Sequence, residues 1–282
     1  MVVDSEFAHT NGAASSTCGA RPYYTPVGNE ETVFKAAYRQ GLSIVLKGPT
    51  GCGKTRFVEA MAHDVGRPLI TVACHDDLTT ADLVGRYLLR GDETVWVDGP
   101  LTRAVREGAI CYLDEVVEAR QDTTVVLHPL ADHRRQLPIE RLGITLDAAP
   151  GFGLVVSYNP GYQSVLKDLK DSTRQRMVAI EFGFPAPELE ESIIVHEAAV
   201  DAGTAAELVR FGQAIRRLET GGLREVASTR VLIAAARLIA EGLPVPVAAR
   251  VAIAGPLTDD AAVARGLHEL IDMYLDEPAS GH

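Results

Sequence analysis

The chain has 282 residues, of which 46% are apolar, and its formal net charge is −11 at pH 7. The length predicts one large or two small domains, and the acidic balance argues against a nucleic-acid or anionic-membrane surface, which would need clustered Lys and Arg. We expect a cytoplasmic protein without membrane insertion, because the sequence has neither a long apolar run nor a basic start followed by an apolar segment.

The first two thirds of the chain predict an α/β domain. Residues 1–20 are rich in small and polar residues without periodicity, so we interpret them as a disordered leader. Over residues 21–185, short apolar runs alternate with segments long enough for helices, which indicates a parallel sheet covered on both faces. The expected strands are Leu42–Lys47, Leu69–Ala73, Ala109–Leu113, Leu154–Tyr158 and Val178–Phe182.

Helical periodicity alone follows Pro185 and Pro187, so a small all-helical domain is predicted over residues 186–282. Arg216 and Arg217 are interpreted as the polar face of one of its helices. The expected helices are Glu188–Asp201, Ala205–Leu218, Ser228–Glu241 and Pro246–Ile253.

A phosphate-binding loop directly follows the first predicted strand. Glycines allow successive backbone N–H groups to point at phosphate oxygens, and the helix predicted over Arg56–Val65 adds its positive end. Lys54 is expected to reach the β- and γ-phosphates of ATP, and Thr55 to offer its hydroxyl to Mg²⁺. The flanking strand and helix disfavour the alternative of a simple tight turn. The loop reads Gly48-Pro49-Thr50-Gly51-Cys52-Gly53-Lys54-Thr55.

Two acids end the third apolar run, at Asp114 and Glu115. The carboxyl edge of an open α/β sheet is where ligands bind, so Asp114 is expected to hold Mg²⁺ through water. Glu115 is then placed to polarise the water that attacks the γ-phosphate. An Asp-Glu pair after a strand is also a common helix N-cap, but the phosphate loop upstream favours the functional interpretation.

The next predicted strand ends in Asn159-Pro160-Gly161. An Asn at this place is commonly a turn former, and the following Pro-Gly supports that alternative. The same edge of the sheet would nevertheless allow the Asn159 amide to reach the γ-phosphate or the attacking water.

The order of phosphate loop, Asp-Glu strand and polar strand end, followed by helices, resembles the AAA+ ATPases. The resemblance implies an arginine finger that enters the site of a neighbouring subunit, for which Arg176 and Arg174 compete, with Arg176 preferred. It also implies a second sensor residue, which contacts the nucleotide bound to its own chain. The residue at the matching position is Arg230.

Two insertions narrow the resemblance to the MoxR branch of AAA+ proteins. The first is hairpin-like, with arms Leu83–Leu89 and Thr94–Val97 around the tip Arg90–Glu93, and the second spans Arg134–Ile139 and Ile144–Leu146. We expect the first hairpin to project toward a partner; the alternative is that Trp96 packs on its own subunit. Several phrases are similar to the CbbQ/NorQ group of this branch: Gly66–Cys74, Asp82–Tyr87, Leu113–Arg120 and Ser157–Tyr162.

The resemblance to this group implies a ring-forming, generally hexameric remodelling ATPase that works with a partner bearing a von Willebrand factor A domain. CbbQ-type members are Rubisco activases that eject inhibitory sugar phosphates, and this is the function expected first. NorQ-type members help nitric oxide reductase to mature, and gas-vesicle GvpN exemplifies a third alternative, an assembly factor that binds nucleotide without acting as a motor.

Overall fold

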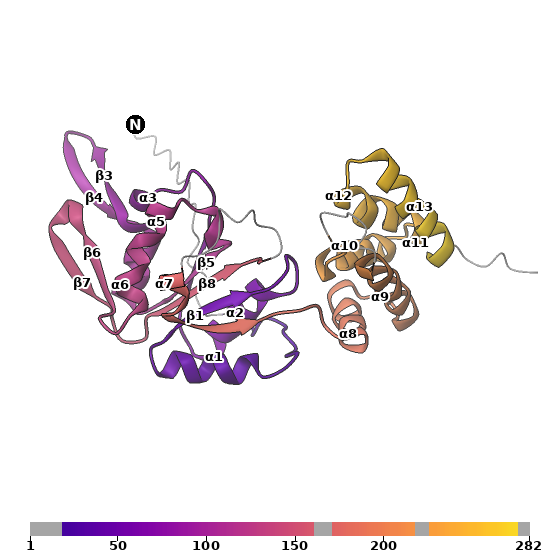
Figure 1. Ribbon diagram of the computed structural model, residues 1–282, viewed down its shortest axis with the longest axis horizontal. Helices are drawn as coiled ribbons and strands as arrows, with labels where there is room; N and C mark the ends of the chain where they lie inside the picture. The colour runs from indigo at the N-terminus through magenta and orange to yellow at the C-terminus, as the bar shows by residue number, and fades with distance from the viewer. Residues whose placement is uncertain (1–18, 161–170, 218–225, 276–282) are drawn as a thin grey trace, which may run out of the picture. The chain divides into compact units, whose positions relative to one another are not determined.

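The computed structural model describes residues 19–160, 171–217 and 226–275, which form two compact units (Figure 1). The first unit includes Asn29–Lys47 and Lys54–Glu181, and the second includes Thr25–Gly28, Gly48–Gly53 and the chain from Phe182 onward. Nearly all of the leader predicted over residues 1–20 lies outside the described residues. The domain boundary predicted near residue 185 stays a prediction.

The centre of the first unit is a sheet of five parallel strands in the order β2-β5-β8-β1-β9. This arrangement confirms the expected parallel sheet, and each strand starts and ends within one residue of its predicted bounds. Because β5, β8 and β1 are adjacent, their carboxyl ends meet at one edge of the sheet. The bounds are β1 Ser43–Lys47, β2 Leu69–Ala73, β5 Ile110–Asp114, β8 Gly153–Tyr158 and β9 Met177–Glu181.

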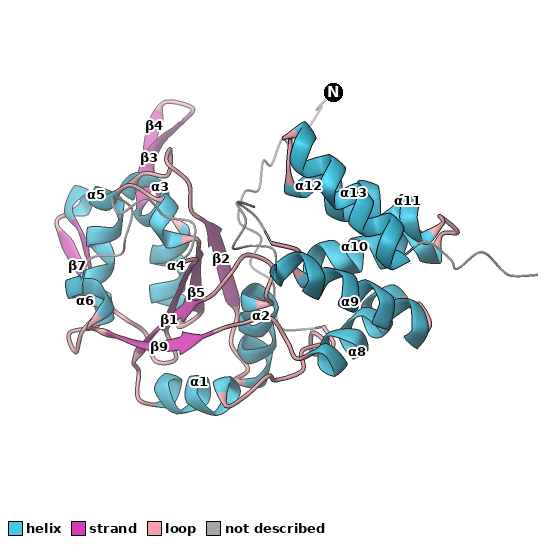
Figure 2. Ribbon diagram, turned by 45° about the vertical axis from the view of Figure 1, so that its right-hand side comes forward, coloured by secondary structure: helices cyan, strands magenta, loops and turns pink. Residues whose placement is uncertain are grey.

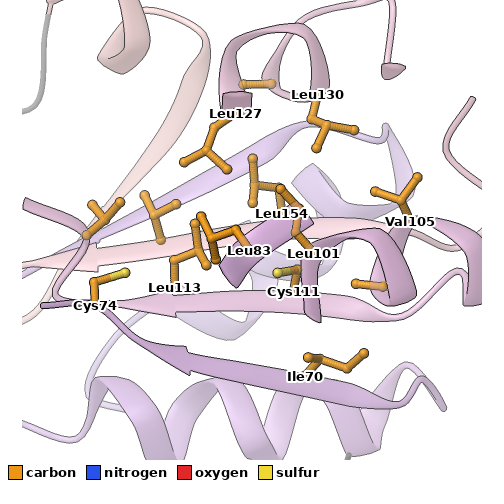
Figure 3. Packing of buried hydrophobic residues seen from close by; sticks show 14 of the residues in the cluster. Ile70, Cys74, Leu83, Leu101, Val105, Cys111, Leu113, Leu127, Leu130 and Leu154 are labelled. Atoms are coloured by element: carbon orange, nitrogen blue, oxygen red, sulfur yellow. The ribbon is translucent and has the colours of Figure 1, made fainter. Parts of the chain in front are cut away.

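Helices cover both faces of the sheet, as Figure 2 shows. On one face, Phe34 of α1 and Phe57 of α2 pack edge to face, with ring centroids 5.5 Å apart. The other face packs against α4, whose Leu101 and Val105 join the buried cluster in Figure 3. Burial on both faces explains the nearly continuous apolar strands. The helices are α1 Glu30–Arg39, α2 Lys54–Asp64, α3 Thr80–Val84, α4 Pro100–Glu107, α5 Gln121–Thr124, α6 His128–Ala131 and α7 Asp171–Arg174, with 3₁₀ turns η1 Val116–Glu118, η2 Val125–Leu127 and η3 Glu140–Leu142.

Alternation along β5 assigns its side chains to the two faces. Cys111 and Leu113 lie in the cluster on the α4 side. Tyr112, between them, points to the opposite face, where its hydroxyl interacts with Thr55 of α2. A polar side chain on the α2 face of this strand is therefore directed toward the start of α2.

Both predicted hairpins are present, each as an antiparallel pair. The first consists of β3 Gly85–Arg90 and β4 Glu93–Asp98, and the second of β6 Gln136–Ile139 and β7 Ile144–Asp147. They depart from the sheet as separate two-stranded ribbons (Figure 1).

The second unit is built mainly from helices. The helix predicted over Pro246–Ile253 is present, but its form changes along the chain: the α-helix ends at Ala249, and a π-helical turn, Arg250–Ala254, continues it. The last helix, Ala261–Leu275, had no predicted counterpart. Among the described residues, no helix is both long and apolar enough to cross a bilayer. The helices are α8 Pro187–Ala198, α9 Ala202–Arg217, α10 Thr229–Ala240, α11 Val245–Ala249, α12 Gly255–Leu257 and α13 Ala261–Leu275.

Candidate functional site

The start of α2 and the end of β5 bring four predicted site residues together. Lys54 is 5% exposed, and its Nζ lies 3.8 Å from Oε1 of Glu115. Next along the helix, Oγ1 of Thr55 lies 3.4 Å from Oδ2 of Asp114, although 59 positions separate the two residues in sequence. The start of α2 and the acidic end of β5 therefore face each other at the carboxyl edge of the parallel sheet.

Asp114 is held by hydroxyl groups from two strands. Its Oδ1 accepts hydrogen bonds from the Tyr112 hydroxyl, at 2.7 Å, and from the Ser157 hydroxyl, at 2.6 Å. Both side chains are fully buried. The other oxygen, Oδ2, faces Thr55. The carboxylate thus has one oxygen engaged inside the sheet and one directed to Thr55 at the start of α2.

Glu115 has a backbone conformation that is uncommon outside glycine, with φ at 52°. Its N–H donates to Oγ of Ser157 at 3.1 Å. Burial raises the pKa of its carboxyl above the usual range, and the charge of Lys54 opposes this rise while that of Asp114 adds to it. A base whose pKa lies closer to neutrality is better matched to proton transfer than an ordinary surface carboxylate.

Asn159 follows β8 and is 6% exposed. Its backbone N–H donates to the Glu115 carboxylate, which lowers the pKa of that group against the larger effect of burial. The structure therefore places Asn159 beside Glu115, the acid expected to polarise the attacking water. The role predicted for its side-chain amide stays a prediction.

The oxygen atoms of Thr55 and Asp114 fit a magnesium site. Mg²⁺ prefers oxygen ligands, keeps several waters, and is usually held by one or two protein groups together with phosphates. A hydroxyl and a carboxylate 3.4 Å apart, at the mouth of a phosphate loop, have this chemistry. No cluster of three or more His, Cys, Asp or Glu side chains suited to a metal occurs in the described part of the chain.

The loop 48–53 belongs to the same compact unit as the C-terminal helices. At Gly51, where φ is 75°, an added Cβ would lie 2.6 Å from Cβ of Ser228 and 3.4 Å from Cβ of Arg230. A side chain at this position would meet the start of α10, so only glycine fits both the backbone and the space. Within this unit, Arg230 thus stands next to the phosphate loop, and its side chain is exposed.

The two candidates for the arginine finger differ in exposure. Arg174 ends the short helix α7 and is half-buried, whereas Arg176, just before β9, is exposed. The buried Thr173 beside them shares a 2.6 Å hydrogen bond with Nε2 of His128, which ties this turn to α6. An exposed side chain on an anchored turn is the geometry that a residue reaching another subunit needs.

The hairpin β3–β4 exposes apolar side chains near its tip, and Trp96 attaches its base to the hydrophobic core. Leu89 is 76% exposed and Tyr87 is 45% exposed. Trp96 is half-buried, packs against the core of its own subunit and donates from Nε1 to Asp98 at 2.6 Å. Trp96 therefore packs on its own subunit, which was the alternative interpretation, while the arms near the tip are exposed.

Sequence reasoning missed Tyr112 and Ser157. Tyr112 lies two residues before Asp114 on β5, and Ser157 lies two residues before Asn159, which directly follows β8. A polar residue two positions before a strand-end ligand shares its face, because side chains alternate along a strand. That spacing was the signal that could have found them. Arg216 was also misassigned: it is not on a solvated face, but pairs with the fully buried Glu190.

Comparison with known proteins agrees with this fold. A family described as "AAA domain (dynein-related subfamily)" matches residues 43–177. A RuvB mutant from Thermotoga maritima superposes with a TM-score of 0.53 over 87% of this chain and 71% of its own, at 14% sequence identity, which supports the fold alone. The fold and the matched domain define an AAA+ ATPase, a class that hydrolyses ATP with Mg²⁺ as its usual cofactor.

The C-terminal helices and two similar sequences define the family. Residues 190–274 match the "CbbQ/NirQ/NorQ C-terminal" domain. The chain is 60% identical to "Denitrification regulatory protein NirQ" of Stutzerimonas stutzeri, over 90% of this chain and 92% of the relative. It is 57% identical to "Protein CbbQ" of Hydrogenophilus thermoluteolus, over 86% of this chain and 90% of the relative. The chain therefore belongs to the CbbQ/NirQ/NorQ family of AAA+ ATPases.

Proposed function

We propose that this ATPase is a ring motor that remodels a protein target, with Lys54, Asp114 and Glu115 at the centre of its site. Lys54 holds the phosphates, and Glu115 takes the proton of the attacking water. Mg²⁺, when bound with ATP, supplies positive charge to the phosphates, and Thr55 and Asp114 are the residues that would hold it. The observation that carries the proposal is the position of Glu115, 3.8 Å from the phosphate-binding Lys54.

A motor and a nucleotide-dependent assembly factor differ in what Glu115 does. A factor that only binds nucleotide, of the gas-vesicle GvpN kind, needs no base for water, whereas a motor requires repeated hydrolysis. We therefore expect target activation to stop in Glu115→Gln, although this variant still binds ATP. Target activation that persists in a Glu115→Gln protein without turnover would contradict the motor and support the assembly factor.

The ring and the finger can be tested by mixing variants. We propose that Arg176 of one chain completes the ATPase site of the neighbouring chain. We also propose that the ring in which this happens is a hexamer. Mixtures of Arg176→Ala chains with Glu115→Gln chains contain interfaces where an intact Glu115 meets an intact Arg176, so some ATPase activity should return. Arg174→Ala, mixed in the same way, is the matched comparison. Mixtures that stay inactive after verified subunit exchange would remove Arg176 from this role.

We propose that the exposed arms of β3–β4 contact a partner with a von Willebrand factor A domain or the target. Contiguous exposed apolar side chains at Tyr87 and Leu89, next to the tip Arg90–Glu93, support this surface. Replacing the tip with a neutral Gly-Ser turn should preserve basal ATPase activity and reduce partner-dependent stimulation. The matched variant replaces the tip 140–143 of the β6–β7 hairpin. Loss of stimulation only in that second variant would move the working surface there.

Two protein targets follow from the family. The similarity to a CbbQ protein supports activation of Rubisco by release of inhibitory sugar phosphates. The similarity to a protein named as a denitrification regulator, which has slightly higher identity and coverage, supports maturation of nitric oxide reductase as the second candidate. The deciding experiment supplies the chain, its von Willebrand factor A partner and ATP to inhibited Rubisco, and in parallel co-expresses them with nitric oxide reductase. Glu115→Gln is the control, and activation of only one target assigns the function.

A further inference from the structure

We propose that Ser157 and Tyr112 are positioning residues that orient the two acids of the ATPase site, and that Ser157 couples one acid to the other. This inference rests on the roles proposed above for Asp114 and Glu115. It concerns two buried hydroxyls that contact neither ATP nor water in the proposed mechanism but act through the carboxylates they bind.

The hydrogen-bond donors around Asp114 determine which of its oxygens is available. An ionised carboxylate only accepts, so the hydrogens in both bonds to Oδ1 come from the hydroxyls of Tyr112 and Ser157. Hydrogen bonds from O–H to a charged oxygen are short and strong, and these are 2.7 and 2.6 Å. With Oδ1 engaged, Oδ2 is the oxygen that faces Thr55 and remains for Mg²⁺ and its waters. The two hydroxyls therefore select the orientation of the carboxylate.

Ser157 has a second contact that Tyr112 lacks. While its hydrogen goes to Asp114, its oxygen accepts the backbone N–H of Glu115 at 3.1 Å. This bond supports Glu115 in its left-handed conformation, at φ 52°. A conformation that is sparsely populated by non-glycine residues persists only where the surroundings hold it. The Ser157 hydroxyl thus orients the side chain of Asp114, the proposed Mg²⁺ ligand, and the backbone of Glu115, the proposed base.

The surroundings of Ser157 and Tyr112 are rigid enough for this task. Both residues are 0% exposed and lie on neighbouring strands of the sheet. Their hydroxyl oxygens are 3.1 Å apart. Groups in the second layer around a metal commonly tune affinity or activity by about 10–100-fold through such contacts. The different contacts of the two residues give different expectations for their removal.

The test compares Tyr112→Phe and Ser157→Ala with Asp114→Asn as reference and Ser43→Ala as control. Ser43 is a buried serine, 3% exposed, at the opposite end of β1. ATP affinity is measured with Mg²⁺ and with EDTA, and turnover is measured against Mg²⁺ concentration. Both hydroxyl variants should need about 10-fold more Mg²⁺ for half-maximal turnover and should lose most of the affinity that Mg²⁺ adds, with binding in EDTA unchanged. Ser157→Ala alone should also lower turnover at saturating Mg²⁺, by about 10-fold.

Distinct outcomes separate failure of this inference from failure of the proposed site. Unchanged Mg²⁺ dependence in both hydroxyl variants, with a clear change in Asp114→Asn, overturns the inference alone. Unchanged Mg²⁺ dependence in Asp114→Asn overturns the site and the inference together. Equal weakening of ATP binding in Mg²⁺ and in EDTA identifies a merely structural role and also overturns the inference. If Ser157→Ala does not fold, Tyr112→Phe still decides the positioning role at Asp114.

Discussion

Two charged clusters, one in each unit, are built in opposite ways. In the helical unit, Glu190 is fully buried, and both of its oxygens are bound by Arg216, at 2.7 and 2.8 Å, with a further bond from Thr229. At the sheet edge, the only ion pair of Glu115 among the described contacts is the 3.8 Å approach of Lys54, and its side chain is 32% exposed. A carboxylate whose two oxygens are both hydrogen-bonded, like that of Glu190, suits a structural role. A loosely paired carboxylate, like that of Glu115, retains the capacity to accept a proton.

The surroundings of Arg216 reinforce this contrast. Its Nε donates to the carbonyl of Ala227 at 2.7 Å, and its guanidinium lies 4.0 Å from the ring centroid of Phe184. The contacts converge on the start of α10, where Thr229 precedes Arg230. The buried pair therefore holds in place the helix start that carries the predicted second sensor.

The largest effect is expected at the loosely paired carboxylate. Glu115→Gln should reduce ATP turnover by about 10²–10⁴-fold, because a general base is lost, while ATP binding persists. Lys54→Ala should instead lose ATP binding, since it removes the charge that meets the phosphates. Steady-state ATPase assays and equilibrium nucleotide binding measure the two properties. Equal loss of binding in both variants would contradict the assignment.

Disruption of the buried pair Glu190–Arg216 should lower the stability of the helical unit. Glu190→Ala leaves Arg216 buried without its partner, so the helical unit should lose about 3–5 kcal/mol of stability. Hydrogen exchange of α8 and α10 under native conditions reports this unit separately. The double variant Glu190→Leu with Arg216→Met removes both charges and should lose much less. A single variant that exchanges as slowly as the parent would show that the pair has no structural role.

The pH dependence of turnover should show the raised pKa of Glu115. The carboxylate is the active form, so activity should fall as the pH decreases, with a midpoint above the ordinary glutamate value, because burial is the largest influence on this pKa. For stability the sign is opposite. A raised pKa in the folded state favours the protonated form, so this group's contribution is full at low pH and is lost as the pH rises through its folded value. An ATPase pH profile on verified folded protein measures the midpoint, and a midpoint at or below the ordinary value would contradict the effect of burial.

The smallest effect is expected at a surface pair in the same helical unit. Arg237 donates to Glu197 at 3.0 Å, but the Arg237 side chain is 60% exposed. Because water screens such pairs, Arg237→Ala should change stability by less than about 1 kcal/mol. The same exchange experiment provides the value, and it serves as the control for Glu190→Ala. A loss as large as that of Glu190→Ala would mean that burial does not distinguish the two pairs.

Local patterns were sufficient for the main elements of the fold and site. The phosphate loop, the acids at Asp114 and Glu115 and the five strands follow from motifs and apolar runs that lie within short windows of sequence. The two hairpins were predictable for the same reason, since their paired arms are close in the chain. The ends of helices and the π-helical turn at Arg250–Ala254 were harder to predict from the sequence, because they depend on packing between helices.

The phosphate-loop motif and the order of strands and helices could be recognised from the chain alone, because these properties depend on neighbouring residues. The contact of Ser157 with Asp114, 43 positions away, and that of Arg216 with Glu190, 26 positions away, could be seen only in the folded structure. Such contacts arise from strand order and helix packing, which no short window of sequence contains. Whether a buried polar residue serves the site or the scaffold is therefore determined by the partners that folding brings to it.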